Sequence, residues 1–157
     1  MKTAIAIIIL TLFSAVGASA QSSVNDPFTF QKACRAQSFV VLHETRDIWL
    51  ADSNNHIGFA SVTSRFDSTT GICYARTDFV IIVKNGTQHD GVITSTTVQD
   101  AFGGTSYAAD LWLNTQGKQA WEVPNLTTCS IKLRGHTEIT CKTNEEFMAI
   151  IDRDFGL

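Results

Sequence analysis

The clearest alternation of apolar and polar residues runs from Phe59 to Val83. Residues 59–66 and 72–83 each alternate with a period of two, and residues 67–71 between them read Asp-Ser-Thr-Thr-Gly. A period of two is typical of a β-strand, and the intervening residues favour a turn. The second segment becomes apolar on both faces over residues 79–83, which is typical of a central strand covered on both sides. We therefore predict a β-hairpin at the centre of a sheet.

Helical spacing of apolar residues marks the beginning of the folded part. Asp26 precedes Pro27, and this pair is typical of a helix start, because Asp accepts a backbone N–H and Pro needs no partner there. Apolar residues then recur at helical intervals as far as Leu42. We predict a helix from Pro27 to about Leu42. Residues 39–41, near its end, are poor helix formers.

A second helix is predicted near the other end of the chain. Thr143 and Glu146 form a capping box, in which each side chain is expected to accept the other residue's backbone N–H. Phe147, Ile151 and the residues around them follow as an apolar stripe, and Gly156 ends the helix.

Shorter strands are predicted between these elements. They are residues 48–50, followed by a turn at 52–55, then residues 92–98, 106–113, 130–133 and 138–140, with a Gly103-Gly104 turn before the third of them. The resulting fold class is α+β: a single antiparallel sheet of about five strands, arranged as a meander, with an N-terminal and a C-terminal helix.

The first twenty residues have the pattern of an export signal. Lys2 supplies a positive start, residues 4–13 form an apolar run too short to span a bilayer, and Ala18-Ser19-Ala20 offers small residues for cleavage. We predict a signal peptide over residues 1–20 and a single secreted domain over residues 21–157. The rest of the sequence contains no second long apolar segment that could span a membrane.

All four cysteines lie in the predicted mature chain. They are Cys34, Cys73, Cys129 and Cys141. An even number of cysteines in an exported chain favours two disulfides, and three pairings are possible. The short separation of Cys129 and Cys141 favours that pair, which leaves Cys34–Cys73. A zinc site is the alternative, but the spacing contains no C-x-x-C pair.

Charge and motifs narrow the chemistry further. Without Lys2 the chain has 11 basic and 15 acidic residues, and no Lys/Arg cluster, which does not favour nucleic acid as a partner. His43-Glu44 begins a zinc-protease motif, but Asp47 stands where the second His is required. A set of carboxylates lies near strands, as a glycosidase would need, but such sets are common: Asp78, Asp100, Asp110 and Glu122. No catalytic, cofactor-binding or metal-binding residue is predicted.

Several short segments form a recognisable set. They are Asp100–Gly104 with Tyr107-Ala108, Trp121–Pro124, Cys129, Cys141 with Glu146-Phe147, and the region Ser64–Tyr74. Together they resemble an uncharacterised family of small exported proteobacterial proteins, which carry Asp-Ala-Phe-Glu-Gly and Trp-Glu-Val-Pro-Pro segments. The chain differs where Gly103 replaces Glu, Asn125 replaces the second Pro and Arg65 replaces His. The resemblance implies bacterial origin and export, and it supplies no catalytic residue.

The sequence therefore predicts a non-enzymatic periplasmic or secreted protein that binds a protein or a small ligand. The expected interaction surface lies where the resemblance is densest, at Asp100, Phe102, Tyr107, Trp112, Trp121 and Glu122. Two alternatives remain open: an inhibitor that inserts loop 84–90 or loop 134–136 into a foreign enzyme, and a small hydrolase of an envelope polymer. Glycosylation of Asn85 and Asn125 also stays open, since both begin Asn-x-Thr.

Overall fold

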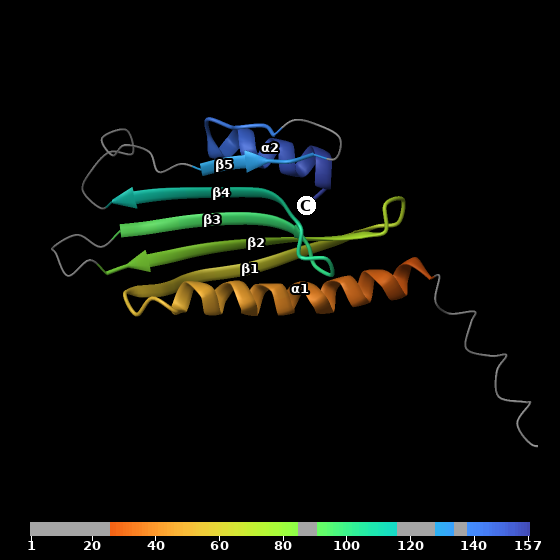
Figure 1. The fold of residues 1–157 in the computed structure, drawn as a ribbon, viewed down its shortest axis with the longest axis horizontal. Helices are drawn as coiled ribbons and strands as arrows, with labels where there is room; N and C mark the ends of the chain where they lie inside the picture. The colour runs from red at the N-terminus through yellow and green to blue at the C-terminus, as the bar shows by residue number, and fades with distance from the viewer. Residues whose placement is uncertain (1–25, 85–90, 116–127, 134–137) are drawn as a thin grey trace, which may run out of the picture.

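The computed structural model describes residues 26–84, 91–115, 128–133 and 138–157. Seven elements follow one another along the chain (Figure 1): α1 (Pro27–Leu50), β1 (Asn55–Asp67), β2 (Ile72–Val83), β3 (Gly91–Asp100), β4 (Ser106–Thr115), β5 (Thr128–Ile131) and α2 (Asn144–Phe155). The predicted α+β meander with a helix at each end is therefore confirmed. The predicted signal peptide lies outside the described residues.

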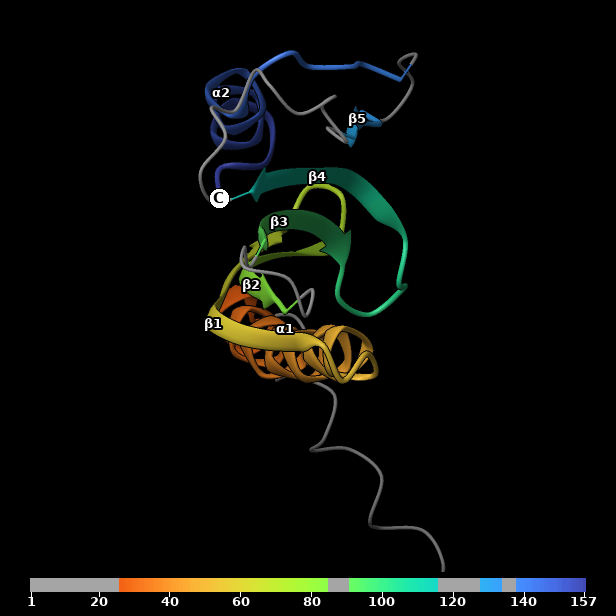
Figure 2. The same ribbon diagram turned by 90° about the vertical axis from the view of Figure 1, so that its left-hand side faces the viewer.

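The five strands form one antiparallel sheet in the order β1-β2-β3-β4-β5. The two helices lie on opposite sides of this sheet, as Figure 2 shows. The hairpin β1-β2 is confirmed, but β1 is an edge strand, so the prediction that the hairpin sits at the centre of the sheet is wrong. A meander adds each new strand on the same side of the previous one, which leaves its first strand at an edge.

Helix α1 is eight residues longer than predicted, and the expected strand at residues 48–50 is its last turn. Its start is as expected, since the Asp26 carboxylate accepts the Phe28 N–H at 3.1 Å. Past Leu42 the helix has no buried residue, but Thr45 and Trp49 are half-buried and continue the side of the helix that carries Cys34, Ser38 and Val41 toward β1 and β2. Tertiary packing of this kind outweighs the weak helix propensity of residues 39–41.

The faces of β2 follow the predicted alternation. One face is buried: Cys73, Ala75, Thr77, Phe79 and Ile81. The opposite face is half-buried, so the expected cover on both sides is realised only in part. The turn before β2 is held by the Asp67 carboxylate, which accepts hydrogen bonds from the Thr69 and Thr70 hydroxyls at 2.6 and 2.7 Å. These bonds, led by that of Thr69, lower the pKa of Asp67 to about 2.

Two separate core clusters lie on the two faces of the sheet. The first joins α1 to the buried face of β2 and consists of Cys34, Val41, Cys73, Ala75 and Ala101. The second joins α2 to β3, β4 and β5 and consists of Val98, Ala108, Cys129, Ile131, Phe147, Ile151 and Phe155. Each cluster contains one disulfide or part of one, because Cys34 pairs with Cys73 and Cys129 with Cys141. The favoured pairing is confirmed.

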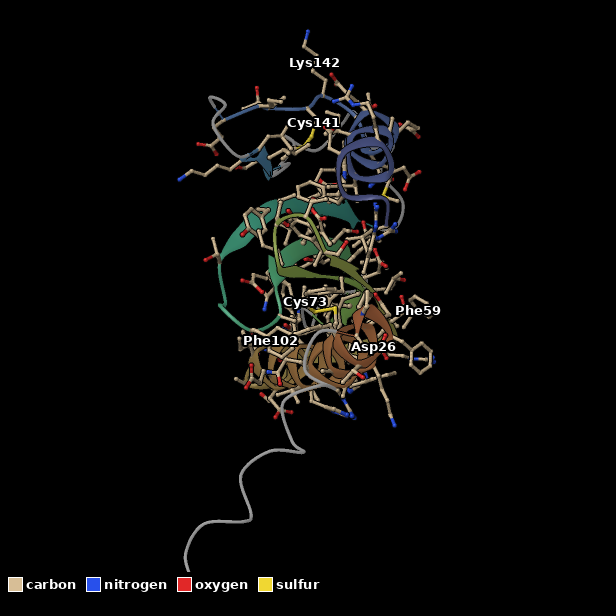
Figure 3. All side chains as sticks on the ribbon, turned by 90° about the vertical axis from the view of Figure 1, so that its right-hand side faces the viewer. Asp26, Phe59, Cys73, Phe102, Cys141 and Lys142 are labelled. Carbon is tan, nitrogen blue, oxygen red and sulfur yellow. A yellow bond between two sulfur atoms is a disulfide. The ribbon has the colours of Figure 1, made fainter. Side chains whose placement is uncertain are left out.

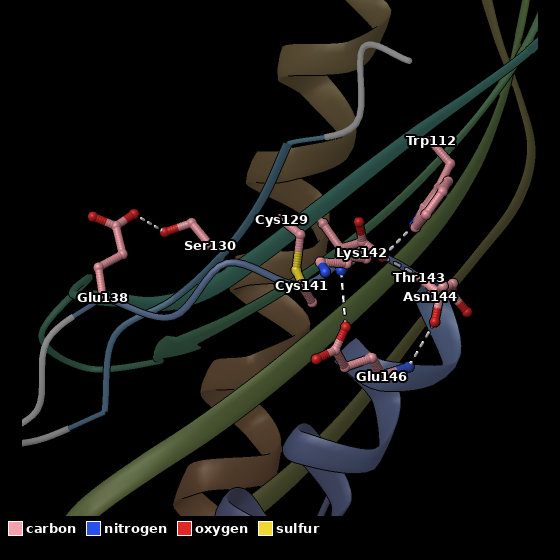
Figure 4. The surroundings of a disulfide bond; sticks show 10 residues. Trp112, Cys129, Ser130, Glu138, Cys141, Lys142, Thr143, Asn144 and Glu146 are labelled. Atoms are coloured by element: carbon pink, nitrogen blue, oxygen red, sulfur yellow. Dashed lines mark hydrogen bonds between the residues drawn. A yellow bond between two sulfur atoms is a disulfide. The ribbon is translucent and has the colours of Figure 1, made fainter.

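The capping of α2 differs from the prediction in one contact. The Thr143 hydroxyl accepts the Glu146 N–H at 3.2 Å, as expected. The Glu146 carboxylate accepts the N–H of Lys142 at 2.9 Å, and not that of Thr143 (Figure 4). At the other end Gly156 adopts a left-handed conformation with φ of 62°, and the Arg65 guanidinium donates to the Phe155 carbonyl at 3.1 Å. A cation at a helix C-terminus is favourable.

Candidate functional site

A groove of about 310 Å³ lies between α1 and the edge strand β1. Its lining comes from three consecutive turns of the helix and from the middle of the strand: Gln31, Arg35, Ser38, Phe39, Val62, Thr63 and Ser64. Helix and strand run side by side in opposite directions (Figure 1), since the chain reverses at residues 51–54 between them. The groove therefore follows the outer edge of the sheet.

Gln31 closes one end of this groove. Its side-chain amide donates to the Ser64 carbonyl at 3.3 Å, and its side-chain carbonyl accepts the Phe66 N–H at 2.8 Å. These are the two backbone groups that a neighbouring strand would pair with. A helical side chain thus takes the place of a strand at this point, in the way that natural proteins protect an exposed edge.

The same two bonds show which backbone groups of β1 point outward. In an antiparallel pair, alternate residues of an edge strand direct their N–H and C=O away from the partner strand. Ser64 and Phe66 point outward, and so, by the same alternation, do Val62 and Ala60. Within the described residues, no hydrogen bond reaches the outward groups of Val62 and Ala60. This open edge, residues 60–62, borders the groove, which Val62 lines.

The two edges of the sheet are unequal. Strand β1 has 13 residues, whereas β5 has four and is followed by a bridge between Ile131 and Ile139. A bulge between Ile57 and Phe59 interrupts the β1 ladder before the open edge begins. This bulge and Gln31 therefore flank a short stretch of regular edge, in which the outward groups of Ala60 and Val62 are open to an added strand.

The side of the sheet opposite α1 carries a polar network around Asp78. Its carboxylate accepts hydrogen bonds from Arg76, Thr96 and Ser61, at 2.9, 3.0 and 3.3 Å. Asp110 on β4 pairs with Thr96 of β3, and its Oδ2 accepts from the Trp112 indole at 2.5 Å and from the Asn144 amide at 2.9 Å. Its Oδ1 is buried and has no partner among the described residues.

These two carboxylates are the pair that a hydrolase would most readily use, because they flank one residue on one face. Asp78 already accepts from three donors, however, and Asp110 is only 1 % exposed. The carboxyl oxygens of Asp110 are therefore not offered at the surface, and the Asp78 carboxylate, whose side chain is 21 % exposed, is already bound by its three donors. Their arrangement is that of structural hydrogen-bonding groups, and it does not favour the hydrolase alternative.

Four of the six residues of the expected interaction surface are among the described ones, and their surroundings differ. Phe102 is 57 % exposed in the turn after β3, where its N–H bonds to Asp100 at 3.1 Å. Tyr107 packs edge-on against Tyr74, with ring centroids 5.4 Å apart, and Trp112 is bound to Asp110. Figure 3 shows Phe102 and the exposed Phe59 on opposite flanks of the molecule. Trp121 and Glu122 lie outside the described residues.

Of the four histidines in the chain, His43 and His56 are exposed, whereas His89 and His136 lie outside the described residues. Both proposed inhibitory loops also lie outside them, apart from Lys84. Among the described residues, no three His, Cys, Asp or Glu side chains come together as metal ligands would.

Sequence reasoning missed the groove. Gln31 and Arg35 belong to a predicted helix, but nothing in the sequence shows which strand edge that helix borders. The predicted first strand covered residues 59–66 and not the 13 residues of β1, so the need of a long edge strand for protection was not visible either.

No protein-family model, curated protein or solved structure matches this chain. In the part of the chain that the structure describes, neither helix has the length and apolar character needed to cross a bilayer. The likeness to small exported proteobacterial proteins therefore stays a resemblance. The groove beside β1 is the feature of the described residues that bears on function.

Proposed function

We propose that this is a non-enzymatic, exported binding protein that captures an extended segment of another protein in the groove between α1 and β1. The observation that carries the proposal is the open edge at residues 60–62, whose outward N–H and C=O groups have no partner among the described residues and border a groove that Val62 lines. An extended segment gains affinity from main-chain hydrogen bonds when it adds to such an edge.

Export is part of the proposal and has two supports. The sequence predicts a leader over residues 1–20, and two disulfides cross-link the described part of the chain. Disulfides persist in oxidising compartments such as the periplasm or the extracellular space. The resemblance to exported proteobacterial proteins favours a bacterial envelope as the setting.

The proposal is tested by selecting binders from a display library of random 12-residue peptides on the oxidised protein. Selected peptides are then measured against Val62→Pro, which removes one outward N–H while leaving the bonds of β1 to β2 intact. Since one or two backbone bonds are lost, affinity should fall about tenfold. Val62→Ala is the matched control, because it keeps the N–H. Equal affinity for Val62→Pro and the control would exclude strand addition at this edge.

A further inference from the structure

Arg35 places an uncompensated positive charge in the groove. It lies one helical turn beyond Gln31 on the same side of α1, and its side chain is exposed. The ion pairs among the described residues involve Arg76 and Arg153, and none involves Arg35. No Asp or Glu is among the residues that line the groove. The groove is therefore complementary to a ligand that carries a negative charge.

The spacing of helix and strand fixes where that charge would lie. Gln31, Arg35 and Phe39 follow one another at intervals of four residues, or about 6 Å along the helix. Two residues of a β-strand span about 6.8 Å, which is nearly the same step. Since Gln31 lies beside Ser64 and the helix runs antiparallel to β1, Arg35 lies near the level of Val62 and Phe39 one step further along.

An added strand presents every second side chain to α1. Its residue at the level of Val62 faces Arg35, and the residue two positions away faces Phe39, whose ring is 45 % exposed. A carboxylate suits the first position, where it forms a charge-assisted hydrogen bond with the guanidinium. An apolar side chain suits the second, where it covers the exposed ring.

We infer that the groove selects an extended peptide with an acidic and an apolar side chain two residues apart, opposite Arg35 and Phe39 respectively. This inference rests on the proposed function and names the ligand class of the same site. The order of the two side chains in the peptide depends on strand direction: acidic before apolar indicates an antiparallel ligand, and apolar before acidic a parallel one.

The test uses the same random 12-residue library on two proteins. The unchanged protein should enrich Asp or Glu two positions from an aromatic or aliphatic residue. Arg35→Glu should enrich Lys or Arg in place of the acid. One selected peptide and a version with its acid replaced by Lys are then measured on both proteins. The ratio of the two peptide affinities should change more than tenfold between the unchanged protein and Arg35→Glu, because the substitution turns attraction into repulsion for the acidic peptide and repulsion into attraction for the Lys peptide.

Lys32→Glu is the matched control. It makes the same change of charge on the same helix, but Lys32 does not line the groove. The ratio of affinities should therefore change less than about twofold, from the general field alone. A change as large as that of Arg35→Glu would overturn the inference, because net charge and not a contact would then explain the selectivity.

Failure of the inference is distinguishable from failure of the proposed function. If selected peptides bind through the edge, as Val62→Pro shows, but carry no enriched acid, the ligand class is wrong and strand addition stands. If no peptide is enriched, both are wrong. If the protein instead self-associates at micromolar concentration and Val62→Pro abolishes this, the occupant is a second copy of the chain and the inference is overturned.

Discussion

Replacing Gln31 with Ala should loosen the edge of the sheet at one defined place. The substitution removes the amide that bonds to the Ser64 carbonyl and the Phe66 N–H, at 3.3 and 2.8 Å. Each hydrogen bond contributes about 0.5–1.5 kcal/mol net, so unfolding should become easier by about 1–3 kcal/mol. The higher helix propensity of Ala offsets only a few tenths of this. For a domain of this size, Tm should fall by about 4 to 12 °C.

Hydrogen exchange locates the effect. The Phe66 N–H points away from β2 and has Gln31 as its partner, so its protection should fall sharply in Gln31→Ala. The N–H of Arg65 points toward β2 and should stay protected, since that ladder is untouched. Gln37→Ala is the control: Gln37 is half-buried on the same helix, and its change should cost less than about 0.5 kcal/mol.

Two results would refute the reasoning. One is a loss of stability in Gln31→Ala no larger than in Gln37→Ala. The other is a Phe66 N–H that stays protected, which would mean that another group occupies the edge. Gln31→Glu adds a finer check, because its carboxylate still accepts the Phe66 N–H but has no donor for the Ser64 carbonyl, so it should lose only part of the stability.

Three further changes test other parts of the fold. Gly156→Ala should lower the free energy of unfolding by about 1–2 kcal/mol, because φ is 62° and the added Cβ would lie 2.0 Å from the Arg65 guanidinium. Gly71→Ala is the control and should cost about 1 kcal/mol in denaturant unfolding, because its φ is similar but its surroundings are open. Equal losses in the two variants would show that Arg65 moves away freely. Because the pKa of Asp67 is lowered, this carboxylate stabilises the fold at pH values above its ordinary pKa of 3.8, and that contribution is lost as the pH falls toward about 2. In Thr69→Ala, NMR titration should show a raised pKa of the Asp67 carboxyl. An unchanged pKa would contradict the assigned cause. Replacing both Cys34 and Cys73 by Ala should lower the free energy of unfolding by about 4 kcal/mol, and replacing both Cys129 and Cys141 by about 3 kcal/mol. The first disulfide costs more to lose because it closes a loop of 39 residues, whereas the second closes 12. A larger loss for the second pair would contradict the loop-closure argument.

Local signals in the sequence were enough for most of the elements. Alternation from Phe59 to Val83 predicted the hairpin, and Thr143 and Gly156 marked the ends of α2, because these features depend on residues close in sequence. The prediction that α1 ends near Leu42 was wrong for the opposite reason. Its last turns carry half-buried residues, such as Thr45 and Trp49, on the side that packs toward the sheet, and the strands of that sheet come later in the chain.

The candidate site was beyond local reasoning. A groove depends on which helix borders which edge, and the contact of Gln31 with Ser64 and Phe66 joins residues more than thirty apart. Aromatic residues drew attention to Tyr107 and Trp112, but their surroundings show packing and a buried hydrogen bond. Exposed Arg35 and Phe39 are ordinary residues of a helix until the strand beside them is known.

The two core clusters lie on opposite faces of one sheet, and each is cross-linked by its own disulfide. Such clusters can open independently, because few side chains belong to both. If the groove binds a ligand as proposed, protection of amides from exchange should therefore increase more around α1 and β1 than around α2. Proteolysis near α2 should then depend little on whether the groove is filled.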